Sequence, residues 1–282
     1  MSRESTPAAS VCYYPRRVIN IVEYRMNTKR FSVSFDGESF EIAADVRHGG
    51  ADLLLFIHGL GGSKAAFHHI WNRSDFAEYS VLVIDLVGFG ASDKPENFPY
   101  TMEAQGQIAA ELLAEFPDRK LHVIGHSMGG AVALLFPADI LNSIETFTNA
   151  EGNLIGADCE IGSRRMVSVS PDIFAAEMFP ELLAKYAGLD EGYSALDSTT
   201  ADVMYQSAES LVSWSDSDKL LEAFFALACR KAYFYGSENS AHPTVARVGD
   251  VPKVEIERSG HIMMCDNPEG FYDELHKFVT AE

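Results

Sequence analysis

Residues 121–136 read LHVIGHSMGGAVALLF, and this stretch decides the fold. A short strand-like segment (LHVI) runs directly into a glycine-rich turn (GHSMGG), and an apolar, helix-like run follows at once. A serine at the centre of such a turn is forced into strained backbone angles, which close-packed glycines on either side permit. We therefore expect Ser127 to stand on a sharp strand-to-helix turn with its hydroxyl group above the edge of a sheet.

Other short, nearly continuous apolar segments are typical of buried parallel strands, because helices cover both faces of such a sheet. Residues 101–116 carry apolar side chains at helical spacing and end at Pro117, which predicts a helix. Residues 31–35 alternate apolar and polar side chains, as a half-exposed antiparallel edge strand does. The expected strands are residues 18–24, 31–35, 52–57, 80–84, 121–124, 144–148, 232–235 and 253–256. Their alternation with helices predicts an α/β fold with a mostly parallel, doubly wound sheet.

Residues 152–227 break this alternation, since they contain no convincing strand and are too many for a loop. The helix-like runs in this segment are residues 173–186, 199–213 and 219–228. We predict a helical cap inserted into the sheet domain. The predicted parts are a first core segment at 1–151, the cap at 152–227, and a second core segment at 228–282.

The charge balance limits the partners of the protein. The chain has 22 Lys and Arg against 41 Asp and Glu, a net charge of −19. Such a surface repels nucleic-acid phosphates and anionic lipid, so we expect neither nucleic acid nor a membrane as a partner. The N-terminal residues lack the apolar segment of a secretory signal, and the four cysteines have no metal-like spacing. These features predict a cytoplasmic protein that binds a small molecule.

A serine is a weak nucleophile at neutral pH and needs a base to accept its proton. Of the nine histidines, His261 lies in a Gly-His turn after an expected strand, where a loop can bring it over the sheet edge. The backbone N–H of Met128 is expected to point to where an oxyanion would form, and the Leu60 N–H is the expected second donor. Asp85 and Ser92 are expected to bind backbone groups in a structural turn.

Four motifs resemble the landmarks of the α/β-hydrolase fold superfamily, in the same order and at similar intervals. They are HGLGG (58–62), DLVGFGASDKP (85–95), GHSMGG (125–130) and SGHIMMCDNPEGF (259–271). The resemblance covers roughly residues 18–150 and 228–280, and the cap between them matches less well. It implies that Ser127 is the nucleophile and His261 the base.

The third member of the expected triad departs from the usual pattern of that family. The family usually places an aspartate at the position that Asn239 holds, and an amide cannot stabilise an imidazolium as a carboxylate does. Some members resemble this chain in carrying the acid after the preceding strand, where Glu151 follows residues 144–148. We predict Glu151 as the acid, with Glu238 and then Asp158 or another cap carboxylate as the alternatives.

These residues predict a serine hydrolase that cleaves a carboxylic ester, a lactone or a related acyl compound through an acyl-enzyme on Ser127. The alternatives are a C–C bond hydrolase or lyase on the same scaffold, and a ligand-binding protein with weak catalysis. No cofactor and no metal are expected, because the chain has no dinucleotide motif, no phosphate loop and no metal-ligand spacing. The acidic surface favours a neutral, partly apolar substrate, with cap aromatic and methionine side chains as the candidate pocket lining.

Overall fold

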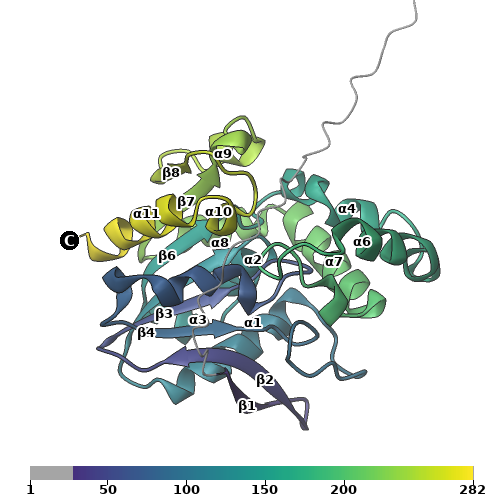
Figure 1. Cartoon of the computed structure of the whole chain (residues 1–282), viewed down its shortest axis with the longest axis horizontal. Helices are drawn as coiled ribbons and strands as arrows, with labels where there is room; N and C mark the ends of the chain where they lie inside the picture. The colour runs from purple at the N-terminus through teal and green to yellow at the C-terminus, as the bar shows by residue number, and fades with distance from the viewer. Residues whose placement is uncertain (1–27, 282) are drawn as a thin grey trace, which may run out of the picture.

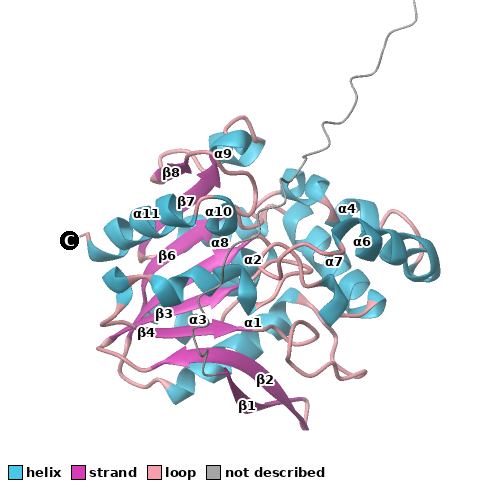
Figure 2. Cartoon of the chain, viewed as in Figure 1, coloured by secondary structure: helices cyan, strands magenta, loops and turns pink. Residues whose placement is uncertain are grey.

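Eight strands form one mixed sheet in the order β1-β2-β4-β3-β5-β6-β7-β8 in this computed structural model, which describes residues 28–281 (Figure 2). Strands β3 to β8 run parallel, whereas β2 is antiparallel to both β1 and β4. The strands are β1 (Thr28–Phe35), β2 (Glu38–Arg47), β3 (Asp52–Ile57), β4 (Ser80–Ile84), β5 (Lys120–His126), β6 (Ile144–Ala150), β7 (Arg230–Gly236) and β8 (Lys253–Ile256).

Helices cover both faces of the sheet, and successive side chains of β3 belong to the two opposite cores. Leu55 packs in the cluster that contains residues of α1 and α2, whereas Phe56 packs in the cluster that contains residues of α10 and α11. Both side chains are fully buried, as the apolar composition of this strand predicts. The helices are α1 (Met102–Glu111), α2 (Met128–Leu134), α3 (Ala138–Ser143), α4 (Ser163–Met166), α5 (Pro171–Ile173), α6 (Phe179–Tyr186), α7 (Ala201–Asp216), α8 (Lys219–Ala226), α9 (Pro243–Arg247), α10 (Met263–Asp266) and α11 (Pro268–Thr280). The predicted doubly wound α/β architecture is confirmed.

The parallel strands appear where the apolar segments predict them. β3, β4 and β8 have the predicted limits, and β5, β6 and β7 are each two or three residues longer than predicted. β1 is the antiparallel edge strand expected around residues 31–35. The strand expected at residues 18–24 lies outside the described residues.

Strand β2 was not predicted from the sequence, and its segment ESFEIAADVR has neither a continuous apolar run nor clean alternation. The turn before β2 contains the sequence pattern that would have predicted this strand. Asp36 and Gly37 both have positive φ angles, 49° and 83°, as the two-residue turn of a tight hairpin requires. An Asp-Gly pair directly after an alternating strand therefore predicts the second strand of a hairpin better than the composition of β2 does.

The segment from 152 to 227 contains helices and loops but no strand. Figure 1 shows α4, α6 and α7 gathered together on one side of the sheet domain. Helix α8 contacts α2 as well as α7, and the ring of Phe224 lies 6.0 Å from that of Phe147 in β6. Helix α8 therefore joins the inserted segment to the sheet. Within residues 28–281 no helix has the length and apolar character that a bilayer crossing needs.

Two adjacent phenylalanines in α8 test this packing. Phe224 is fully buried against Phe147, whereas Phe225 is 46% exposed. We expect Phe224→Ala to lower the free energy of unfolding by about 3–5 kcal/mol, because it leaves a cavity in the core. Phe225→Ala is the matched control and should cost under about 1 kcal/mol. Urea denaturation followed by circular dichroism measures both, and equal effects would contradict the packing of α8 described above.

Candidate active site

Ser127 stands on a strained turn between β5 and α2. Its φ and ψ angles are 51° and −122°, a conformation that costs energy for any residue with a Cβ atom. Two close approaches of the backbone permit this turn. A Cβ atom on Gly129 would overlap the carbonyl oxygen of Ile57, and one on Gly125 would lie 2.7 Å from the carbonyl oxygen of Gly129. Glycine is therefore required at both positions, and this turn has the geometry that the motif predicts.

The register of the parallel strands brings the loops after them to one edge of the sheet. Gly125 in β5 pairs with Ile57 in β3, and Ala150 in β6 pairs with both His126 in β5 and Phe234 in β7. The turn at Ser127, the residue after β6 and the loop after β7 therefore lie side by side. Side chains at the carboxyl edge of an open parallel sheet are well placed to form a site.

Glu151 follows β6 directly and binds His261 at this edge. The distance from His261 Nδ1 to Glu151 Oε2 is 2.7 Å, and the carboxylate is buried. Glu151 has a positive φ of 44°, so the backbone turns sharply at this residue. Its N–H donates to the carbonyl oxygen of Phe234 at 2.9 Å, which anchors the turn to β7.

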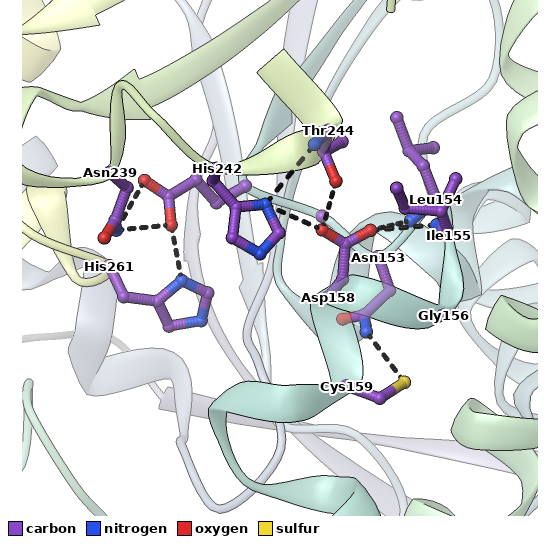
Figure 3. A network of polar contacts seen from close by, with 12 residues as sticks. Asn153, Leu154, Ile155, Gly156, Asp158, Cys159, Asn239, His242, Thr244 and His261 are labelled. Carbon is purple, nitrogen blue, oxygen red and sulfur yellow. Dashed lines mark hydrogen bonds and ion pairs between the residues drawn. The ribbon is translucent and has the colours of Figure 1, made fainter. Parts of the chain in front are cut away.

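Asn239 donates to the same carboxylate. Its side-chain amide lies 3.0 Å from Oε1 and 2.9 Å from Oε2 of Glu151, and the backbone N–H of Gly236 donates to Oε1 at 2.8 Å. Figure 3 shows Asn239 and His261 close to each other at this end of the polar network. The amide at the position of the usual family aspartate thus supports a carboxylate that comes from the neighbouring strand.

Burial by itself would raise the pKa of Glu151. The hydrogen bond and the charge of His261, with the hydrogen bonds from Asn239 and Gly236, outweigh burial and lower the pKa below its ordinary value of 4.5. The carboxylate is therefore ionised at neutral pH. An ionised carboxylate at Nδ1 orients the imidazole ring and leaves its Nε2 atom to face the cavity.

The two alternative acids make other contacts. Glu238 is exposed, and its backbone N–H donates to the carbonyl oxygen of Ser259. Asp158 accepts hydrogen bonds from two backbone N–H groups and from the hydroxyl of Thr244 at 2.6 Å. Neither carboxylate bonds to His261, so the structure brings Glu151, and not Glu238 or Asp158, to this histidine.

Ser127 and His261 line one cavity of about 500 Å³. No hydrogen bond joins their side chains within residues 28–281. Hydrogen bonds between a nucleophile and its base are often long in the absence of substrate. Leu60 lines the same cavity, and its backbone N–H donates to no acceptor in the described part of the chain. Met128 is the first residue of α2, where a helix leaves its N–H groups without partners.

Side chains from the inserted segment form much of the cavity wall, as the sequence suggests for a cap. Residues 152–227 contain eleven methionine, phenylalanine, tyrosine and tryptophan side chains. Five of them line the cavity: Met166, Met178, Tyr186, Tyr193 and Met204. Most of the others are buried away from it, and Phe225 is exposed. The walls also contain the apolar side chains of Leu182, Leu196 and Leu211, together with two acidic and two basic residues: Asp158, Glu181, Arg165 and Lys185.

Histidine 126 has a role that sequence reasoning missed. Its Nε2 donates to the backbone carbonyl oxygen of His261 at 2.9 Å, and the two rings lie 4.8 Å apart. Burial, and then the charge of His261, lower the pKa of His126 well below 6.5, so its ring is neutral at pH 7. His126 thus holds the backbone of the His261 loop against the turn that carries Ser127. Only the folded structure shows this contact, because the two residues are far apart in the sequence.

His58, Asp85 and Ser92 bind backbone groups near the site. His58 is buried, accepts from the Leu86 N–H at 3.1 Å and donates to the Gly59 carbonyl oxygen. Asp85 and Ser92 bind backbone groups of the neighbouring turn and strand, as predicted. Within residues 28–281 no three His, Cys, Asp or Glu side chains are arranged as metal ligands.

A sequence profile described as the alpha/beta hydrolase fold matches residues 52–219, more than half of the chain. The chain belongs to the α/β-hydrolase fold family. The profile match confirms the resemblance that the four motifs suggest.

The curated relatives and the solved structures differ in what they share with this chain. Lipase 1 of Psychrobacter immobilis is 35% identical over 123 residues, which are 42% of this chain and 38% of the lipase. The 2-hydroxy-6-oxononadienedioate/2-hydroxy-6-oxononatrienedioate hydrolase of Cupriavidus pinatubonensis is 32% identical over 114 residues, 39% of each chain. The chain thus spans well under half the length of these two relatives.

A crystal structure of the N-acyl homoserine lactonase AidH with N-butanoyl homoserine superposes with a TM-score of 0.71. The match covers 91% of this chain and 99% of the lactonase, at 18% sequence identity. At that identity the likeness concerns the fold.

The pKa of Glu151 predicts how stability depends on pH. Because this pKa is lower in the folded chain than its ordinary 4.5, the ionised carboxylate stabilises the fold above that pH. This contribution is lost as the pH falls from about 4.5 through the lower, folded-state value. We expect Glu151→Gln to cost about 1–3 kcal/mol at pH 6 and less at pH 3.5, as measured by urea denaturation.

Glu238→Gln is the matched control for this experiment, since that carboxylate is exposed in the same loop cluster. It should keep the pH dependence of the wild type. If Glu151→Gln destabilised the chain equally at both pH values, the assignment of a stabilising ionised carboxylate to Glu151 would be wrong.

Proposed function

We propose that this protein is a serine hydrolase that cleaves a carboxylic ester or a lactone. One observation carries the proposal: His261, bonded to the buried carboxylate of Glu151 at 2.7 Å, lines the same cavity as Ser127 on its strained turn. The proposed triad is Ser127 as nucleophile, His261 as base and Glu151 as acid. Membership of the α/β-hydrolase fold family and the similarity to a lipase support this assignment.

The first half of the reaction forms an acyl-enzyme. Ser127 Oγ attacks the carbonyl carbon of the substrate, and His261 Nε2 accepts the hydroxyl proton as the new C–O bond forms. The N–H groups of Leu60 and Met128 stabilise the negative charge on the carbonyl oxygen. As the tetrahedral intermediate collapses, the bond to the alcohol oxygen breaks, and His261 returns its proton to that oxygen.

The second half releases the acid. Water attacks the acyl carbon, His261 accepts a proton from the water, and the same two N–H groups hold the oxyanion again. The bond from the carbonyl carbon to Ser127 Oγ then breaks, and His261 returns the proton to the serine. Throughout, Glu151 holds Nδ1 of the ring and stabilises the imidazolium that forms at each proton transfer.

The cavity favours a neutral substrate of modest size. Its volume of about 500 Å³ suits a small molecule, and the two acidic and two basic residues in its walls balance in charge. An anionic substrate would approach against the net charge of −19.

We propose that residues 152–227 act as the cap over this cavity, between core segments 1–151 and 228–282. The free thiols at Cys159, Cys229 and Cys265 support a cytoplasmic location.

A second candidate function is hydrolysis of a C–C bond next to a ketone. The similarity to the Cupriavidus hydrolase favours it, because the named substrates of that enzyme carry an oxo group and two carboxylates and no ester. The same histidine and oxyanion donors would serve there, and a stable acyl-enzyme on Ser127 would be dispensable.

The direct test combines labelling with a substrate panel. A fluorophosphonate should label Ser127 in the wild type, as intact mass and peptide mapping show, and Ser127→Ala should not be labelled. We expect Ser127→Ala and His261→Ala to lower kcat/KM on esters and lactones by about 10⁴-fold or more. Glu151→Gln should lower it by about 10²–10⁴-fold, with kcat carrying the loss.

The matched control is Glu238→Gln, which should stay within about threefold of the wild type because this exposed carboxylate makes no hydrogen bond to His261. Hydrolysis of esters that persists in Ser127→Ala would overturn the proposal. A Ser127 that resists labelling, together with turnover of vinylogous ketones but not of esters, would favour the C–C hydrolase instead.

A further inference from the structure

Asn153 lies in the wall of the cavity beside the nucleophile, and the proposed reaction does not use it. It follows Glu151 by two residues, and its backbone N–H donates to the carbonyl oxygen of Ser127 at 3.2 Å. The residue is only 2% exposed, yet it lines the same cavity as Ser127 and His261. A buried polar side chain is thus placed close to where the reacting carbonyl group would sit.

Within the described residues, the side-chain amide of Asn153 has one hydrogen-bond partner, and this bond is weak. The nitrogen Nδ2 donates to Cys159 Sγ at 3.6 Å, and a thiol sulfur is a poor acceptor. The oxygen Oδ1 receives no hydrogen bond from any residue within 28–281. Figure 3 shows the nitrogen turned to Cys159 and the oxygen on the opposite edge of the amide, on the side where His261 lies. An amide oxygen in the cavity wall without a protein partner can accept a hydrogen bond from a molecule bound in the cavity.

The backbone around Asn153 is fixed by a separate set of hydrogen bonds. Asp158 Oδ2 accepts from the N–H groups of Leu154 and Ile155 at 2.7 and 2.9 Å, and Asp158 Oδ1 accepts from Thr244. Figure 3 shows the Asp158 carboxylate between Thr244 on one side and Leu154 and Ile155 on the other. The loop after Glu151 is therefore held from both ends, by the Ser127 turn and by Asp158. The backbone that carries Asn153 is thus held in place beside the cavity.

We propose that Asn153 is a substrate-binding residue whose Oδ1 accepts a hydrogen bond from an N–H or O–H group next to the scissile carbonyl. A buried carbonyl-type oxygen only accepts, so the matching substrate group must be a donor. The preferred substrates are then α-acylamino or α-hydroxy esters and lactones. This inference rests on the proposed serine hydrolase function and narrows its substrate class.

The energetics favour discrimination at such a position. A substrate without the donor leaves the buried oxygen unpaired, and sites that bond a substrate N–H or O–H reject the analogue that lacks it. Leu182, Leu196 and Leu211 form an apolar part of the cavity wall. This part distinguishes substrates mainly by size. Asn153 would therefore select the group beside the carbonyl, and the apolar wall would select the remainder.

The test compares two esters that differ by one methyl group. Phenyl N-acetylglycinate carries an amide N–H next to the ester carbonyl, and phenyl N-acetylsarcosinate carries an N–CH₃ instead. We expect the wild type to prefer the first, and Asn153→Leu to reduce the ratio of the two kcat/KM values by about tenfold. Comparing this ratio between the wild type and the variant cancels the difference in intrinsic reactivity between the two esters. Asn153→Asp keeps an accepting oxygen and should keep the preference.

Cys159→Ala is the control for a purely structural role. It removes the thiol to which Asn153 Nδ2 donates but leaves Oδ1 in place, so the preference should persist. If Asn153→Leu lowered kcat/KM equally for both esters, or if Asn153→Asp lost the preference as fully as Asn153→Leu, the inference would be overturned.

Labelling separates this inference from the proposed function. Fluorophosphonate labelling of wild-type Ser127 and hydrolysis of both esters, with a ratio that Asn153→Leu leaves unchanged, would overturn the inference alone. Absence of both labelling and ester hydrolysis in the wild type would overturn the proposed function and the inference together.

Discussion

The hydrogen bond from His261 Nδ1 to Glu151 Oε2 joins three separate parts of the chain at one point. The carboxylate follows β6 and the histidine follows β8. Gly236 at the end of β7 donates to Oε1, and Asn239 in the loop after β7 donates to both oxygens. A buried carboxylate is stable in this position only because these donors compensate for the loss of water. The orientation of the histidine ring, and with it the chemistry proposed for the cavity, depends on that compensation.

The sheet supplies the precision that this interaction needs. Pairing of β5, β6 and β7 places Ser127, Glu151 and Asn239 after neighbouring strands, and the cores on both faces keep the strands from sliding. Ser127 and Glu151 both have positive φ angles. Strain at two adjacent strand ends is tolerated because the packed sheet below determines where those ends lie. The close approach of Gly129 to β3 is one part of that packing.

The fold and the candidate nucleophile could be predicted from the sequence because both are written in short, local patterns. Apolar segments such as residues 52–57 become buried strands, and the glycine-rich turn around Ser127 follows one of them. Strand β2 was missed because its composition is mixed, although the Asp36-Gly37 pair before it signals a hairpin. Local patterns also left three acids open, since the partner of His261 is decided by strand register, which no short window of sequence contains.

Asn239 shows most clearly what local sequence patterns cannot predict, because in the sequence it stands only where the family usually has an aspartate. In the structure its amide donates to both oxygens of Glu151. The most direct test of the account is a proton NMR spectrum of the His261 ring, assigned with His261→Asn. We predict a low-field Nδ1–H signal that persists in Glu238→Gln and disappears in Glu151→Gln. A signal unchanged in Glu151→Gln would contradict the account, because another group would then hold the ring.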